Sequence, residues 1–188
     1  QYRGYVDEDG VTPGSDTETF IAVKLWIDSW RWAGVPFYIR GGKYLAATAT
    51  EAVVEFKKPP RLFFAGPNTP MPAANRLRFR LGKNDGVTLQ LQAKAPGELM
   101  VSKPVDLDVS YEEAFGHRQD AYERLLGDAI EGVTTRFGRE DSLEQQWRIV
   151  DNVLAHPEPV RLYTKGTWGP ELASRLLEHG ATWYEPES

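Results

Sequence analysis

Hydrophobic and polar residues alternate through much of the first two-thirds of the chain, which is the period of a β-strand. Four segments share this pattern: residues 20–28, 76–81, 87–92 and 105–109. In the first segment, the residues expected to form the buried face are Ile21, Val23, Leu25 and Ile27. Clean alternation is typical of antiparallel strands with one face on a core, because strands buried on both faces read as continuous hydrophobic runs. Asn84-Asp85-Gly86 predicts a hairpin turn between two of these strands.

The last third of the chain changes to helical spacing. A first helix is expected after Asp120, a competent N-cap, and should end near Gly132. A second helix is expected to be capped by Asp141 or Ser142 and to end before Pro157. Its predicted buried stripe consists of Leu143, Trp147, Val150 and Leu154.

A third helix is predicted from Pro170 to Gly180, since proline favours the first helical turn and glycine the end. Strands followed by helices indicate an α+β fold. We therefore expect a large, mostly antiparallel sheet with helices packed on one face.

Composition narrows the class of protein. With 188 residues, 41% of them hydrophobic, the chain is expected to form one domain over residues 1–188 and to bury a substantial core by itself. The net charge of −5 disfavours binding to nucleic acid or to an acidic membrane surface. The absence of cysteine excludes a disulfide scaffold and suits a reducing compartment. No hydrophobic stretch approaches the roughly 20 residues of a membrane span.

The most informative candidate for chemistry is the run from Arg40 through Gly41 and Gly42 to Lys43, which follows a hydrophobic stretch. Glycine lets the backbone turn sharply and approach a ligand, while lysine brings a compact positive charge on a flexible stem. This combination is typical of a phosphate site. A solvated lysine at a loop end is the plain alternative.

The histidines His117, His156 and His179 lie far apart in the sequence and show no metal-ligand spacing. The sequence shows no cluster of serine, histidine and an acid that would indicate a hydrolase. We therefore predict no metal site within this chain.

Several blocks in fixed order resemble one family. They are residues 1–5, 17–20, 31–43, 120–126 and Trp168-Gly169-Pro170. Together they identify the chain as similar to the C-terminal, substrate-binding and oligomerisation domain of glucose-6-phosphate dehydrogenase, along its whole length. The resemblance implies a longer enzyme whose N-terminal NADP-binding Rossmann domain is absent from this sequence, because no Gly-rich dinucleotide turn follows a first strand.

The resemblance also implies an activity and partners. The whole enzyme would oxidise glucose 6-phosphate to 6-phosphogluconolactone with NADP, the first step of the oxidative pentose phosphate pathway, in the cytoplasm. It would act as a homodimer or homotetramer, and this chain alone, without its cofactor domain, would be inactive. By its place in the motif, Lys43 would contact the sugar phosphate, with Arg40, Gly41 and Gly42 forming the loop that supports it.

The chain departs from the family pattern in the substrate pocket. Thr48 stands where a second basic residue is usual, and Gly82 replaces a glutamine two residues after Arg80. These departures leave open a dehydrogenase for a related phosphosugar, or a non-catalytic homologue that serves in assembly or regulation.

A second, structural NADP site occurs in some members of the family, and Arg40 matches one of its residues. At the other positions of that site, such members have basic residues or a tyrosine. This chain has Ala49, Thr88, Gln90 and Trp168 there. Of that set only Arg80 obviously remains. We predict no structural NADP site in this chain.

Arg76, Arg78 and Arg80 form a row at strand spacing. The row could face an anion, but pairing across strands with Asp106, Asp108 or glutamates is the favoured interpretation, because cross-strand charge pairs are common.

Overall fold

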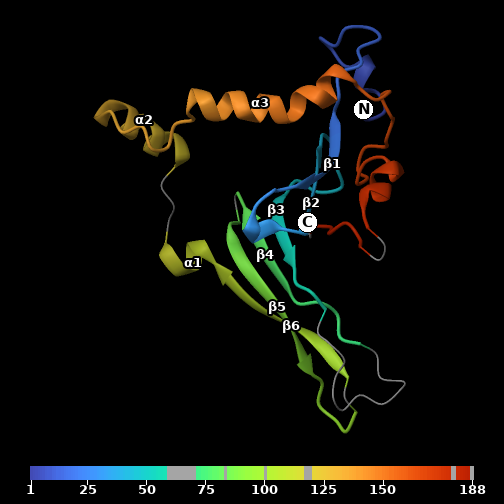
Figure 1. Cartoon of the computed structure of the whole chain (residues 1–188), viewed down its shortest axis with the longest axis vertical. Coiled ribbons are helices and arrows are strands. Elements are labelled where there is room, and N and C mark those ends of the chain that lie inside the picture. The colour runs from blue at the N-terminus through green and yellow to red at the C-terminus, as the bar shows by residue number, and fades with distance from the viewer. Residues whose placement is uncertain (59–70, 83, 100, 117–119, 179–180, 187–188) are drawn as a thin grey trace. The chain divides into compact units, whose positions relative to one another are not determined.

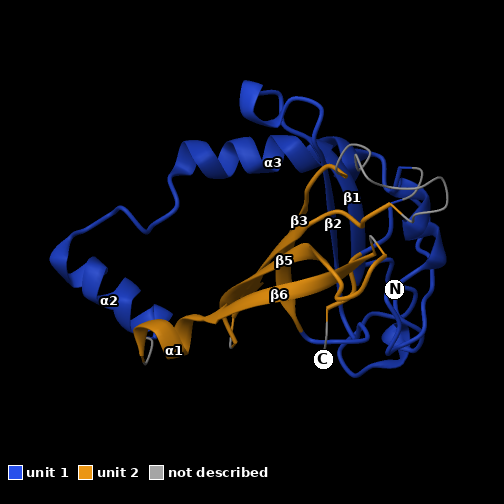
Figure 2. Ribbon diagram, turned by 90° about the horizontal axis from the view of Figure 1, so that it is seen from below, with its two compact units in different colours: residues 1–48, 119–183 blue, residues 49–118, 184–188 orange. Residues whose placement is uncertain are grey.

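The computed structural model describes residues 1–58, 71–82, 84–99, 101–116, 120–178 and 181–186 (Figure 1). The chain divides into two compact units (Figure 2). Unit 1 consists of residues 1–48 and 119–183, and unit 2 of residues 49–118 and 184–188. The antiparallel sheets and few helices confirm the predicted α+β class. The described strands form two sheets, where the sequence predicts a single large one.

Unit 1 contains a two-stranded antiparallel sheet of β1 (Phe20–Trp26) and β2 (Pro36–Gly42). Phe20 pairs with Gly42 at one end, and Trp26 pairs with Pro36 at the other. Short 3₁₀ helices lie at η1 (Tyr5–Asp7), η2 (Trp30–Trp32) and η3 (Glu171–Leu176). The two longer helices are α2 (Ala121–Glu131) and α3 (Glu140–Ala155).

The core of unit 1 is aromatic. Tyr2 and Tyr163 are both buried, and their backbones form a parallel bridge. The Phe20 ring lies 5.6 Å from the Tyr163 ring. Phe20 therefore faces the core, and the predicted buried face of this strand is wrong for Ile21, which is 52% exposed. The alternation is that of a strand, but the aromatic contacts determine which face is covered.

Local signals predict the limits of α2 correctly. The Asp120 carboxylate accepts a hydrogen bond from the backbone N–H of Tyr122 at 2.8 Å, and Gly132 ends the helix with a left-handed φ of 70°. The predicted caps of α3 are wrong, because this helix begins at Glu140, before Asp141 and Ser142. The Asp141 carboxylate instead accepts a hydrogen bond from Arg139.

The third predicted helix is a short 3₁₀ turn at Glu171–Leu176, and its predicted end at Gly180 lies outside the described residues. The predicted buried stripe of α3 is wrong, since Trp147 is 59% exposed and its three companions are also exposed. The expected substantial core is wrong as well: among described residues, the buried hydrophobic ones are Tyr2, Ala74 and Tyr163. Periodicity shows which residues share a face, but it does not supply the partner that covers the face.

Unit 2 contains a four-stranded antiparallel sheet in the order β3-β4-β5-β6. Its strands are β3 (Thr50–Glu55), β4 (Arg76–Leu81), β5 (Gly86–Lys94) and β6 (Ser102–Ser110). The predicted hairpin is confirmed, because β4 and β5 pair directly across the short connection that includes Asn84 and Asp85. The helix α1 (Tyr111–Phe115) follows β6, and Ser110 caps it. No helix in the described parts of the chain is long and hydrophobic enough to cross a membrane.

Candidate functional site

The glycine block lies inside β2 and not in a turn. Gly41 and Gly42 pair with Ile21 and Phe20, and neither has a positive φ. The expectation of a sharp glycine turn is therefore wrong. The left-handed residue is instead Tyr44, at φ 49°.

The two glycines differ in the space around them. A Cβ atom added at Gly42 would lie 2.9 Å from Cδ2 of Phe20 and 3.1 Å from the backbone oxygen of Thr19, whereas one added at Gly41 would meet nothing within 4 Å. Contacts below about 3 Å require a neighbour to move. Gly42 is thus required for close packing against the hairpin partner, while Gly41 is under no such constraint.

The backbone of Lys43 is fixed on both sides. Its N–H donates to the carbonyl oxygen of Thr19 at 2.9 Å, and its own carbonyl oxygen accepts from the Tyr163 hydroxyl at 2.8 Å. The next residues are held by the segment after Tyr163: Gly166 N–H donates to Tyr44 O at 2.9 Å, and Ala46 N–H donates to Thr167 O at 3.1 Å. Residues 43–46 are thereby bound along residues 163–167.

The side chain of Lys43, in contrast, is exposed. Within the described ranges, its ammonium group makes no hydrogen bond or ion pair. An ammonium on a fixed backbone and free of an acidic neighbour can bind an anion without first breaking another contact. The same exposure also fits the plain alternative, a solvated lysine.

Arg40 lies on β2 between two tryptophans of the same unit. The carbon of its guanidinium lies 4.6 Å from the Trp168 ring centroid and 5.0 Å from that of Trp183. Stacking of this kind is a favourable cation–π contact. Arg40 therefore supports the strand that leads into Lys43, and the part played by Trp183 is not visible in the sequence.

A second lysine near the block is already neutralised. The Lys165 ammonium donates to the Glu8 carboxylate at 3.1 Å and lies 4.2 Å from the ring centroid of Tyr44 and 4.7 Å from that of Tyr2. Its hydrogen bond holds the pKa of Glu8 below the usual value, while desolvation and a hydrogen bond to Glu8 raise the pKa of Tyr2 to about 12. This arrangement anchors Tyr44 and neutralises Lys165, whereas the described residues place no acid on the Lys43 ammonium.

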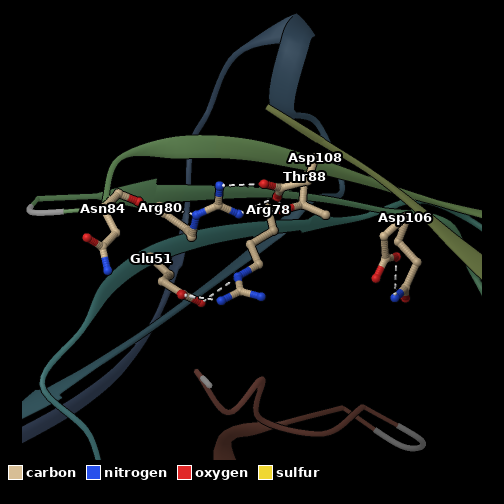
Figure 3. Close-up of polar contacts among 8 residues, drawn as sticks. Glu51, Arg78, Arg80, Asn84, Thr88, Asp106 and Asp108 are labelled. Carbon is tan, nitrogen blue, oxygen red and sulfur yellow. Dashed lines mark hydrogen bonds and ion pairs between the residues drawn. The ribbon is translucent and has the colours of Figure 1, made fainter. Parts of the chain in front are cut away.

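The arginines of the row in unit 2 are also paired, and Figure 3 shows the contacts of Arg78 and Arg80. Arg78 donates to both oxygens of Glu51 at 2.7 and 3.1 Å, and Arg80 donates to Asp108 at 2.6 Å. Arg76 forms an ion pair with Glu55 at 2.8 Å, in keeping with the row. The predicted cross-strand pairing is confirmed for all three arginines.

The pairing with Arg80 also affects the acidity of Asp108. Hydrogen bonds from Arg80 and then Thr88 hold the pKa of Asp108 below its usual value. Asp106, its neighbour on the same face, accepts from Gln90 at 3.0 Å and not from an arginine.

The positions at which the chain departs from the family pattern belong to different units. Thr48 is exposed at the end of the first segment of unit 1, and Gly82 follows β4 in unit 2 with φ 120°. His156 is exposed and its ring contacts the Asn152 carbonyl, while His117 and His179 lie outside the described residues. Among described residues, no group of three or more His, Cys, Asp or Glu is placed to hold a metal ion.

Thr19 and Tyr163 are the residues that sequence reasoning missed. Both lie in or near blocks that carry the family resemblance, yet no local pattern connects them with Lys43, because Tyr163 is 120 residues away. Only the fold brings Thr19, Lys43 and Tyr163 together.

These features define an α+β domain of antiparallel sheets in which one hairpin presents a fixed, exposed lysine. A family model described as "Glucose-6-phosphate dehydrogenase, C-terminal domain" matches residues 1–184, and the chain belongs to this family.

Curated relatives agree along nearly the whole chain. The glucose-6-phosphate 1-dehydrogenase of Rhizobium meliloti (strain 1021) is 44% identical over 190 residues, covering 96% of this chain and 38% of the relative. That of Treponema pallidum (strain Nichols) is 38% identical over 192 residues, covering 98% and 37%. The chain thus spans less than two-fifths of the length of these relatives.

Solved structures agree as well. The crystal structure of glucose-6-phosphate 1-dehydrogenase from Mycobacterium avium has a TM-score of 0.85 and 38% identity, covering 100% of this chain and 40% of that one. A glucose-6-phosphate dehydrogenase solved in complex with glucose 6-phosphate has a TM-score of 0.79 and 30% identity, covering 96% of this chain and 38% of that one.

Proposed function

We propose that this chain is the substrate-binding and oligomerisation domain of an NADP-dependent glucose-6-phosphate dehydrogenase, and that Lys43 binds the phosphate of the sugar. The observation that carries the proposal is the combination at Lys43 of a backbone held by Thr19 and Tyr163 with an exposed ammonium. Family membership and a relative solved in complex with glucose 6-phosphate support the choice of substrate.

The chain contributes binding and orientation in this proposal, and no catalytic group. NADP, bound by the N-terminal domain of the whole enzyme, would accept a hydride from C1 of the sugar. Lys43 would hold the remote phosphate by a charge-assisted hydrogen bond, which orients the reacting carbon. We also propose that the chain has no structural NADP site; in support, Arg40 stacks on two tryptophan rings and Arg80 is paired with Asp108.

The test is NADP reduction by the full-length enzyme with glucose 6-phosphate, comparing the parent with Lys43→Ala. Loss of a charge-assisted hydrogen bond costs about 1.5–3 kcal/mol, so the KM for glucose 6-phosphate should rise about 10- to 150-fold. The KM for NADP should not change. Lys57→Ala, which removes another exposed lysine, should leave both constants at the parent values.

An unchanged KM in Lys43→Ala would contradict the role of Lys43. Activity that prefers another phosphosugar would favour the related dehydrogenase, for which Thr48 and Gly82 are the supporting features. A folded parent that reduces neither NADP nor NAD with any phosphosugar would favour the non-catalytic assembly or regulatory homologue. An intact dinucleotide turn and histidine base upstream would favour the enzyme.

Further proposals concern assembly and location. We propose that an exposed sheet face forms a subunit contact, giving a homodimer or homotetramer in the cytoplasm with no membrane or nucleic-acid partner. Sedimentation that shows only monomer at high protein concentration would contradict the assembly.

A further inference from the structure

Tyr163 is one of the most buried residues described in the chain, at 3% exposure. Its own backbone is fixed, because its N–H donates to Gln1 O at 3.0 Å and its carbonyl accepts from Arg3 N–H at 2.8 Å. Its ring lies against Phe20 at 5.6 Å and Tyr2 at 6.4 Å. The hydroxyl group is therefore held in one place by backbone and ring contacts alike.

The hydroxyl of Tyr163 has a single proton and two carbonyl acceptors. It lies 2.8 Å from Lys43 O and 3.0 Å from Thr19 O. The Thr19 hydroxyl, 3.2 Å away, accepts a hydrogen bond from Tyr2 N–H at 3.0 Å and can donate its own proton to the phenol oxygen. Each polar group of this buried set is satisfied.

The consequence falls on the residue that carries the exposed ammonium. Thr19 O accepts from Lys43 N–H, so the same two partners, Thr19 and Tyr163, hold both peptide groups of Lys43. The next residue, Tyr44, is held in the left-handed region, which is strained for a non-glycine residue. Without the phenol, the peptide between Lys43 and Tyr44 would lose the donor that opposes its rotation.

We propose that Tyr163 is a positioning residue for the phosphosugar: its hydroxyl fixes the peptide of Lys43 and so the direction from which the ammonium reaches the phosphate. Tyr163 is too buried to touch the substrate itself, and it acts through Lys43. This inference rests on the function proposed for Lys43.

The test is Tyr163→Phe in the full-length enzyme, which removes the hydroxyl and keeps the ring. The KM for glucose 6-phosphate should rise about three- to tenfold, the range for one neutral hydrogen bond. We expect kcat to stay within about twofold of the parent, and the KM for NADP to be unchanged, because the chemistry and the cofactor are not involved.

A double-mutant cycle separates positioning from general loosening. In the Lys43→Ala background, Tyr163→Phe should raise the KM no further, because the ammonium that it positions is gone. An equal factor in both backgrounds would overturn the proposal. An unchanged KM for Lys43→Ala itself would remove the proposed role of Lys43, and this inference with it; a raised KM for Lys43→Ala with an unchanged KM for Tyr163→Phe would overturn the inference alone.

Tyr2→Phe is the matched control. It removes another buried phenol hydroxyl of the same cluster, one bonded to Glu8 and not to the Lys43 peptide. It should lower the unfolding midpoint but leave the KM for glucose 6-phosphate unchanged. A rise equal to that of Tyr163→Phe would mean that any loss in this core loosens the site, and would overturn the proposal.

A second variant covers the case in which Tyr163→Phe does not fold. Thr19→Val removes the hydroxyl that contacts the phenol oxygen and keeps both carbonyl acceptors. It should raise the KM by about twofold, again with no further effect in the Lys43→Ala background. An unchanged KM in this variant would overturn the proposal.

Discussion

Two basic regions of this chain lie on antiparallel strands and differ in their neighbours. In unit 2, the guanidiniums of Arg76, Arg78 and Arg80 each meet a carboxylate from another strand of the same sheet. In unit 1, Lys43 follows β2 with its backbone fixed and, among the described residues, no acid on its ammonium. The number of positive charges therefore says little about anion binding, because neighbouring strands decide which charge is available.

Strand register is the cause of this difference. Arg76 lies opposite Glu55 and Arg80 opposite Glu51, while Asp108 lies opposite Thr88 on the next strand pair. All of these side chains therefore share one face of the sheet. Lys43, which follows β2, lies opposite Thr19, and Thr19 gives the Lys43 N–H a backbone carbonyl oxygen as its acceptor but has no carboxylate to pair with the ammonium.

The largest effect that would sharpen this comparison is expected for Arg78→Ala. The Arg78 and Glu51 side chains are only 17% and 7% exposed, so the variant leaves a largely desolvated carboxylate without its partner. Truncation of one member of a buried pair costs about 3 kcal/mol or more in the free energy of unfolding. Chemical denaturation measures this change, and the KM for glucose 6-phosphate should stay at the parent value.

Arg76→Ala is the control on the same strand face. Its pair with Glu55 is 38% and 52% exposed, and exposed pairs contribute below about 1 kcal/mol. Equal losses of stability in the two variants would contradict the argument from burial. A raised KM in a fully stable Arg78→Ala would show that the row binds substrate.

The difference between the regions also shows what sequence alone can predict. The hairpin at Asn84-Asp85 and the caps of α2 are predicted correctly because turns and caps depend on a few neighbouring residues. The pairing of the arginine row is predicted correctly because the alternation of its charges is visible in the sequence. The contact of Tyr163 with Lys43 spans 120 residues and leaves no periodic signal. The prediction of a buried stripe around Trp147 fails, because helical spacing shows which residues share a face but does not reveal whether another element covers that face.

A change in stability of intermediate size is expected for the glycines beside Lys43, and it tests whether that region depends on close packing. Gly42→Ala places a Cβ atom 2.9 Å from the Phe20 ring and 3.1 Å from Thr19 O. Overpacking of this kind costs about 1–3 kcal/mol, and a shift of Thr19 should also raise the KM for glucose 6-phosphate.

Gly41→Ala is its neighbour and control, because the added Cβ meets nothing within 4 Å and the backbone φ is not positive. This variant should be neutral or slightly more stable, by up to about 1 kcal/mol. Denaturation and steady-state kinetics of both variants check the pair. Equal behaviour would contradict the packing argument, since the two residues differ mainly in how close β1 comes.

The smallest effect is the pH dependence of the Arg80–Asp108 pair. Arg80 and Thr88 hold the pKa of Asp108 below its usual value in the folded chain. The contribution of this pair to the free energy of unfolding is therefore complete above the unfolded pKa of about 4, and it is lost as the pH falls through the folded pKa. The Asp108 side chain is 51% exposed, so its contribution should be below about 1 kcal/mol. Asp108→Asn should therefore lower stability slightly at neutral pH and approach the parent at acidic pH. Denaturation curves between neutral and acidic pH measure this. If the stability of Asp108→Asn changed with pH just as that of the parent does, the Arg80–Asp108 pair would make no electrostatic contribution to stability. The contrast between a paired Arg80 and a Lys43 without an acid among the described residues would then have no energetic basis.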